Sequence, residues 1–134
     1  LIDFGIIVSQ EIIDYFPKGI VNSHFSLLPE LRGADPISFA ILEGKNITGV
    51  SLMLLVKAMD EGPILSRGEL ELTGTETGPS LTDSLVILSH SLLKNTIPAY
   101  LNNMINPASG VTPVPRSQEI ICNLLNKEFN PTYT

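Results

Sequence analysis

Apolar and polar positions change their spacing several times along the chain, and each change predicts a new element. Residues 48–56 (TGVSLMLLV) form a nearly continuous apolar run, which predicts a strand buried on both faces. Residues 64–72 alternate, which is typical of a strand nearer the edge of a sheet. Residues 1–8 and 20–25 are also rich in apolar and β-branched side chains, and we expect a strand in each.

Helical spacing occupies the segments between these strands. Ser9 is a suitable N-cap for a short helix over residues 11–16, and a proline opens a second helix over residues 36–42. The longest helix is predicted over residues 80–102, and we expect Pro98 to break or kink it. Its leucines recur at helical spacing, at Leu81, Leu85, Leu88, Leu92 and Leu93.

The order of these elements predicts an α/β fold with a mainly parallel sheet. In such folds the chemistry lies beyond the carboxyl ends of the strands, and two polar clusters, at residues 22–24 and 59–62, follow apolar strands. Residues 106–134 carry several prolines and no strong periodicity. We therefore expect one domain over residues 1–105, followed by an irregular tail or the start of a linker over residues 106–134.

The composition is that of a globular domain, since 43% of the 134 residues are apolar and 16% are charged. Cys122 is the single cysteine, which excludes an internal disulfide and is compatible with a reducing cytosol. The net charge is −6 and the eight Lys and Arg residues are scattered, so this segment alone should bind nucleic acid poorly. No apolar run approaches a membrane span, and Leu1 in place of an initiator Met indicates a fragment.

Asn22 and His24 are the first candidates for chemistry. They are two positions apart, so on a strand they share one face, whereas Ser23 points the other way. An amide can donate to a developing oxyanion, and an imidazole can donate, accept or become charged near neutral pH. A purely structural polar strand end would explain the same residues, and the pair alone leaves both interpretations open.

Asp60 and the loop over residues 26–33 (SLLPELRG) are further candidates. Asp60 is either a turn former before Glu-Gly-Pro or a carboxylate that holds an imidazole proton or relays a proton to water. We expect its neighbour Glu61 to be solvated. The loop leucines either plug into the core or form the wall of an apolar ligand slot. We expect Ser26 to bond to the backbone and Arg32 to lie at the surface or cap a helix.

Several other kinds of site are not supported by the sequence. The chain has no Gly-rich dinucleotide fingerprint, no P-loop and no nucleophile elbow around Ser26. His24 and His90 lack the spacing of metal ligands, and we expect no metal.

The motifs together resemble the folate-dependent formyltransferase family, whose pattern is Asn-x-His-x-Ser-Leu-Leu-Pro followed at a distance by Asp-x-Gly. Here the pattern reads NSHFSLLP at residues 22–29 and MDEG at residues 59–62. LRGADPI and TGVSLMLL are most similar to the branch of the family that acts on methionyl-tRNA. The resemblance implies a three-layer, Rossmann-like formyltransferase fold, of which this chain is the C-terminal half of the catalytic domain without its N-terminal strands.

The resemblance also implies a reaction: transfer of a formyl group from 10-formyltetrahydrofolate to the α-amino group of methionyl-initiator tRNA, a cytoplasmic step of translation initiation without a metal. Asn22 would stabilise the tetrahedral oxyanion, His24 would polarise the formyl group, and Asp60 would orient His24 and help to remove the amine proton. The folate side would be lined or shaped by Ile6, Ile7, Val8, Ser26, Leu27, Leu28, Pro29, Met59 and Gly62. Parts of the protein outside this chain would hold the tRNA.

Two alternatives stay open at this point. The acceptor could be another amine, such as glycinamide ribonucleotide or an amino sugar nucleotide. The chain could also be a non-catalytic folate-binding or interaction module, inactive as a fragment, whose exposed strand edge over residues 1–8 favours self-association.

Overall fold

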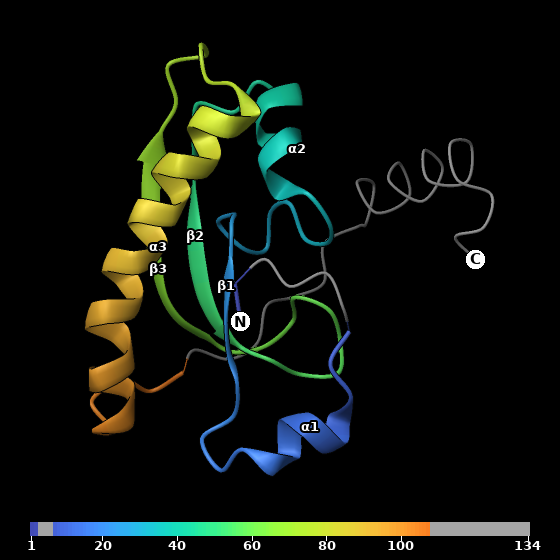
Figure 1. The fold of residues 1–134 in the computed structure, drawn as a ribbon, viewed down its shortest axis with the longest axis vertical. Helices are drawn as coiled ribbons and strands as arrows, with labels where there is room; N and C mark the ends of the chain where they lie inside the picture. The colour runs from blue at the N-terminus through green and yellow to red at the C-terminus, as the bar shows by residue number, and fades with distance from the viewer. Residues whose placement is uncertain (3–6, 108–134) are drawn as a thin grey trace, which may run out of the picture.

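A computed structural model of the chain describes residues 1–2 and 7–107. Figure 1 shows three strands side by side, with one long helix along the sheet and two short helices at opposite ends of it. The alternation of helices and strands confirms the predicted α/β class. In chain order the elements are α1 (Gln10–Tyr15), β1 (Val21–His24), α2 (Pro36–Leu42), β2 (Ile47–Leu54), β3 (Ile64–Glu71) and α3 (Gly78–Leu101).

The sheet has the order β1-β2-β3, and both of its ladders are antiparallel. Among the described residues, parallel pairing is limited to a bridge between Ile2 and Ser23. These three strands therefore differ from the predicted mainly parallel arrangement. For β2 and β3 the reason is the short connection over residues 55–63, because parallel neighbours need a crossover of a dozen or more residues.

Of the predicted strand over residues 1–8, Leu1 and Ile2 pair with β1, and residues 3–6 lie outside the described residues. Ile7 and Val8 have no regular structure, and Ile7 is 76% exposed. Apolar composition alone does not make a strand where no neighbouring strand completes its hydrogen bonds. Ile6 lies outside the described residues, as does almost all of the tail predicted over residues 106–134.

β2 is buried on both faces, as its continuous apolar run predicts. On one face, Val50 and Leu52 belong to a core cluster that includes Leu81 and Leu85 of α3. On the other face, Met53 packs in a smaller cluster with Leu28 and Ile64. The sheet thus separates a large core under α3 from a smaller one under the loop that follows β1.

Hydroxyl pairs add to the apolar packing between α3 and the sheet. Ser23 of β1 bonds to Ser89 at 2.7 Å between their Oγ atoms, and this pair is buried. Ser66 of β3 bonds to Thr96 at 2.8 Å, about two helical turns further along α3. Each pair satisfies two hydroxyls that would otherwise lose hydrogen bonds to water on burial.

Capping residues define where the helices begin. Ser9 accepts a hydrogen bond from the backbone of α1, and Asp35 does the same for α2. Thr77 forms a capping box with Ser80 at the start of α3. Of the break or kink predicted at Pro98, a break is not found, since the helix continues through the proline to Leu101. The proline removes a single backbone donor close to the end of the helix, where little helix remains to be disrupted.

Candidate active site

Asn22 and His24 lie on the face of β1 that points away from α3, and Ser23 lies on the other. This arrangement follows from their i, i+2 spacing and from the contact of Ser23 with α3. Both side chains line a cleft of about 270 Å³, and Asp60 lines it as well. The three residues singled out in the sequence are therefore in one place. The side chain of Asn22 has no hydrogen-bond partner among the described residues, so its amide is available to a ligand.

Asp60 reaches the cleft on the loop between β2 and β3. The loop is closed by a 2.9 Å hydrogen bond from the Leu54 N–H to the carbonyl of Pro63. Gly62 is required here, because any Cβ at this position would overlap the Leu54 carbonyl. Since β1 and β2 are antiparallel, the two polar clusters do not meet at a shared carboxyl edge. They meet because this loop turns back toward the end of β1.

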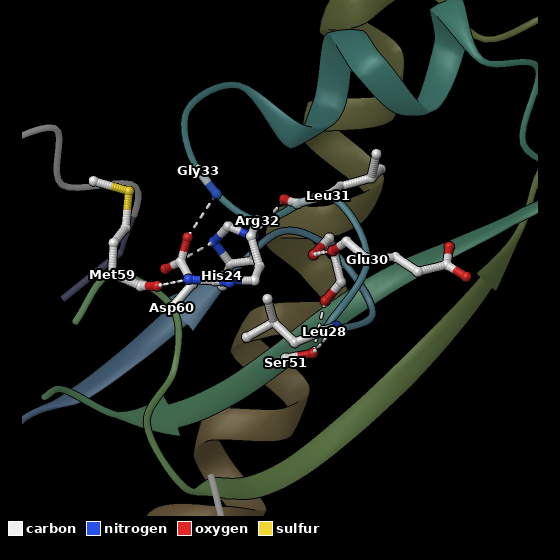
Figure 2. A network of polar contacts seen from close by, with 10 residues as sticks. His24, Leu28, Glu30, Leu31, Arg32, Gly33, Ser51, Met59 and Asp60 are labelled. Atoms are coloured by element: carbon white, nitrogen blue, oxygen red, sulfur yellow. Dashed lines mark hydrogen bonds and ion pairs between the residues drawn. The ribbon is translucent and has the colours of Figure 1, made fainter. Parts of the chain in front are cut away.

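His24 is held through both of its ring nitrogens, as Figure 2 shows. Nε2 lies 3.0 Å from the carbonyl oxygen of Leu31. A carbonyl can only accept, so Nε2 carries a proton in this arrangement. Nδ1 lies 3.7 Å from Oδ1 of Asp60, and both side chains are about nine-tenths buried. The pair attracts when the imidazole is protonated, and burial strengthens that attraction.

Asp60 is itself fixed by the loop that follows β1. Its Oδ2 accepts a 2.7 Å hydrogen bond from the Gly33 N–H, which leaves Oδ1 directed at His24. Its backbone is left-handed, with a φ of 55°, and so is that of Leu31, with a φ of 54°. This conformation costs a non-glycine residue about 1–2 kcal/mol. The surrounding contacts must therefore stabilise both residues in place.

Arg32 and Glu61 differ from the sequence predictions. Arg32 is only 8% exposed, and its Nη2 donates to the Met59 carbonyl and to Oε1 of Glu61, both at 2.7 Å. The predictions of a surface or capping arginine and of a solvated Glu61 were therefore wrong. The physical reason is that each charged group has its ion-pair partner on the other loop, and a charge-assisted hydrogen bond of this kind replaces part of its hydration.

Residues 26–32, the first part of the loop after β1, pack beneath the cleft and do not line it. Ser26 Oγ donates to the carbonyl of Glu30 at 2.6 Å, which confirms the predicted backbone bond. Ser51 of β2 joins the loop to the sheet, because its Oγ donates to the Ser26 carbonyl and accepts from the Leu28 N–H. Leu28 is 1% exposed and belongs to the smaller core cluster. The loop is thus a rigid support for the residues that follow it.

The residues predicted for the folate side divide into two groups. Ile7, Val8 and Met59 line the cleft. Ser26, Leu27, Leu28, Pro29 and Gly62 do not line it, and Ile6 lies outside the described residues.

Several groups that build the cleft had no signal in the sequence. The Leu31 carbonyl and the Gly33 N–H act through the backbone, so no residue type marks them. Residues 33–36 also line the cleft, because the loop after β1 folds over it.

No group of three His, Cys, Asp or Glu side chains is placed to hold a metal ion in the described part of the chain. Among residues 1–2 and 7–107, no helix is long and apolar enough to cross a membrane. The chemistry available in the cleft is that of an amide donor beside an imidazole and a carboxylate. Such a set can stabilise an oxyanion and move a proton.

Residues 1–97 match the protein family described as formyl transferase. The chain is 38% identical over 125 residues to the methionyl-tRNA formyltransferase of Bacillus licheniformis. That match covers 88% of this chain and 40% of the relative, so the chain spans well under half of the relative's length.

Solved structures show the same fold. The phosphoribosylglycinamide formyltransferase of Bacillus halodurans has a TM-score of 0.63 at 29% identity, over 75% of this chain and 50% of that one. The N-formyltransferase of Helicobacter canadensis, solved with folinic acid and dTDP-3-aminofucose, has a TM-score of 0.72 at 24% identity, over 80% of this chain and 39% of that one. These similarities confirm the predicted formyltransferase fold.

Proposed function

Because the chain belongs to the formyl transferase family, we propose that its full-length protein transfers a formyl group from 10-formyltetrahydrofolate to the α-amino group of methionyl-initiator tRNA. The observation that carries the proposal is the placement of Asn22, His24 and Asp60 around one cleft. The family assignment supports the type of reaction. The methionyl-tRNA formyltransferase relative supports the acceptor.

The proposed reaction passes through a tetrahedral adduct. The amine nitrogen attacks the formyl carbon, and the carbonyl oxygen becomes an oxyanion to which the Asn22 amide donates. His24 and Asp60 take up the proton that the attacking amine must lose. The bond from the formyl carbon to N10 of the folate then breaks, and N10 receives a proton. Every group needed for these steps is present without a covalent intermediate on the protein.

The geometry adds a condition to the role of His24. Its Nε2–H is donated to the Leu31 carbonyl, so His24 polarises the formyl group only after exchanging that bond for one to the substrate. Asp60 keeps a fixed orientation during this exchange, because the Gly33 N–H holds its other oxygen. Asp60 therefore stays fixed, and His24 is the side chain that exchanges its hydrogen bond when the substrate binds.

The folate would lie against the apolar part of the cleft. Ile7, Val8 and Met59 supply apolar walls, and a few polar groups converge beside them, as is usual for sites that bind flat organic rings. Ser26, Leu27, Leu28, Pro29 and Gly62 would shape this slot from behind by fixing its two loops. Two formyltransferase structures of this fold were solved with folinic acid or tetrahydrofolate, which supports a folate donor.

A second acceptor class has support from the solved structures. They include a phosphoribosylglycinamide formyltransferase and a sugar 3N-formyl transferase, so glycinamide ribonucleotide or an amino sugar nucleotide is the alternative. We favour methionyl-tRNA because the sequence identity to a methionyl-tRNA formyltransferase is higher, 38% against 29% for the first of these structures. The net charge of −6 requires other parts of the protein to hold a polyanionic tRNA.

An acceptor panel tests the proposal. The full-length protein is given 10-formyltetrahydrofolate with methionyl-initiator tRNA, glycinamide ribonucleotide or an amino sugar nucleotide, and the formylated product is measured. The expected result is efficient formylation of methionyl-tRNA. If the protein prefers a small acceptor, the alternative acceptor class is correct. If it transfers the formyl group to none of these amines, the proposed function is refuted.

A further inference from the structure

Arg32 joins the two loops on which the cleft depends. It lies on the loop after β1, directly before Gly33, and its Nη2 reaches across to the loop between β2 and β3. There it donates to the Met59 carbonyl and to the Glu61 carboxylate, both at 2.7 Å. These two partners flank Asp60 on either side in the sequence.

The contacts from Arg32 and Gly33 act on three successive residues. Arg32 holds residues 59 and 61, and the Gly33 N–H holds Oδ2 of Asp60 between them. Asp60 has a left-handed backbone with a φ of 55°, which it would leave if released. The hydrogen bonds to its neighbours therefore fix both the backbone and the carboxylate of Asp60.

The burial of Arg32 is costly if its role is stability alone. Within the described residues, its Nε and Nη1 atoms are buried and have no hydrogen-bond partner. Unsatisfied donors and a desolvated charge offset most of what one ion pair contributes, and apolar replacements of buried ion pairs are often as stable. A guanidinium is nevertheless suited to this position, because one rigid planar group can donate to a carbonyl and a carboxylate at once.

We propose that Arg32 is a positioning residue, which clamps residues 59–61 so that the Asp60 carboxylate stays against His24. The inference rests on the proposed function for its effect on catalysis. Arg32 does not line the cleft, so it acts through Asp60 and not on the substrate. Losing the clamp would let the loop relax and would separate the carboxylate from the imidazole.

Three variants of the full-length protein test the clamp: Arg32→Met removes it, Arg32→Lys keeps the charge without the planar fork, and Glu61→Gln weakens one arm. Arg67→Met is the matched control, because Arg67 is exposed on β3. For each protein, kcat and KM for the folate donor are measured across pH. The NMR signals of the His24 imidazole ring are compared at one fixed pH, and the melting temperature is recorded.

Arg32→Met is expected to lower kcat by about 10- to 100-fold, the size of effect that follows a misplacement of about an ångström. The donor KM should change less than kcat, because Ile7 and Val8 are untouched and, of the apolar walls, Met59 alone lies on the released loop. The NMR signals of the His24 ring should shift relative to the parent, because Oδ1 of Asp60 would no longer lie beside Nδ1. Arg32→Lys should recover part of the rate, and Glu61→Gln should lie between the parent and Arg32→Met.

The inference is overturned if the variants match Arg67→Met in kcat, or if kcat falls only as the folded fraction falls while the His24 ring signals stay as in the parent. Should Arg32→Met not fold, Arg32→Lys and Glu61→Gln decide by the same readouts. The NMR comparison does not need an active enzyme. An inactive parent in which Arg32→Met still shifts His24 would therefore refute the proposed function and leave the clamp supported.

Discussion

The two faces of the sheet, one covered by α3 and the other carrying the cleft, differ in the hydrogen bonding of their polar groups and in the conformation of their backbone. Under α3, leucines fill the core and the hydroxyls of Ser23 and Ser66 are paired with helix residues, with the buried hydroxyl of Thr48 as an exception. Beside the cleft, Asp60 has a left-handed backbone and Arg32 keeps two buried donors without described partners.

This difference indicates that the two faces have different roles. A well-packed face whose polar groups are mostly hydrogen-bonded contributes to folding free energy. Strained backbone and unpaired polar groups are found more often at functional sites, where the structure fixes a geometry needed for activity. We therefore expect substitutions under α3 to change stability and substitutions beside the cleft to change activity. Matched pairs of variants test whether the effects on stability and on activity separate in this way.

The largest expected effect is on activity, from His24→Ala in the full-length protein. Removing a general acid–base group lowers kcat by about 10²- to 10⁴-fold. His90→Ala is the matched control, because His90 is exposed on α3. Steady-state formyl transfer by the two variants is compared with the parent. Equal rates for the two variants would place the chemistry elsewhere.

The next effect is on stability, from Leu85→Ala under α3. Leu85 is fully buried, and truncating such a leucine costs about 2–5 kcal/mol in the free energy of unfolding. Ile87→Ala, at a site that is 72% exposed, should change it by less than about 0.5 kcal/mol. Denaturant unfolding measures both. The remaining folded Leu85→Ala protein should keep its specific activity, and a loss of kcat would show that the two faces are coupled.

A smaller effect is expected from the hydroxyl pair between Ser23 and Ser89. Ser89→Ala leaves the Ser23 hydroxyl buried without its partner, which costs about 1–3 kcal/mol. The double variant with Ser23→Ala should be less destabilised than the sum of the two single variants, because no hydroxyl is then left unpaired. Ser91→Ala, at an exposed position of α3, is the control. If the free-energy costs of the two single variants add up to that of the double variant, the two hydroxyls do not interact.

The smallest effect concerns Glu76, in the turn before α3. Its carboxylate accepts hydrogen bonds from the backbone of Thr73 and Gly74, and the Thr73 N–H bond is the main cause that lowers the pKa of Glu76 to about 2. A carboxyl with a depressed folded pKa contributes stability above its unfolded value, so this contribution is lost as pH falls from 4.5 toward 2.

Glu76→Gln should therefore show a shallower loss of stability than the parent across that acid range, measured by thermal unfolding at a series of pH values. Glu69→Gln on β3 is the comparison, since Glu69 is exposed and has no side-chain hydrogen bond among the described residues. If Glu76→Gln and Glu69→Gln follow the same pH dependence, the turn does not hold its carboxylate as described.

The sequence predicted the elements under α3 better than the loops beside the cleft. β2 was predicted as buried on both faces because a continuous apolar run leaves no face for water. Ser9 marked the start of its helix because capping is a local interaction between neighbours in the chain. Strand direction was not predictable, since periodicity records which face is apolar and not which way a neighbour runs.

The side chains of the candidate site could be predicted from the sequence, but the groups that hold them in place could not. The spacing of Asn22 and His24 placed both on one face, and the motif that includes Asp60 added the carboxylate. Arg32 was misassigned because a lone arginine is usually exposed, and its partner on a distant loop is visible only after folding. The Leu31 carbonyl that orients His24 is a backbone group, which no residue type reveals.

The most direct test of the account is the rate of a single turnover of formyl transfer by Asn22→Ala in the full-length protein. The Asn22 side chain lines the cleft and makes no hydrogen bond within the described structure, so its removal should leave the fold intact. With saturating donor and acceptor, we predict a rate about 10²- to 10³-fold below the parent, the cost of removing one oxyanion donor. A parent-like rate from a folded Asn22→Ala protein would contradict the assignment of this cleft as the reaction centre.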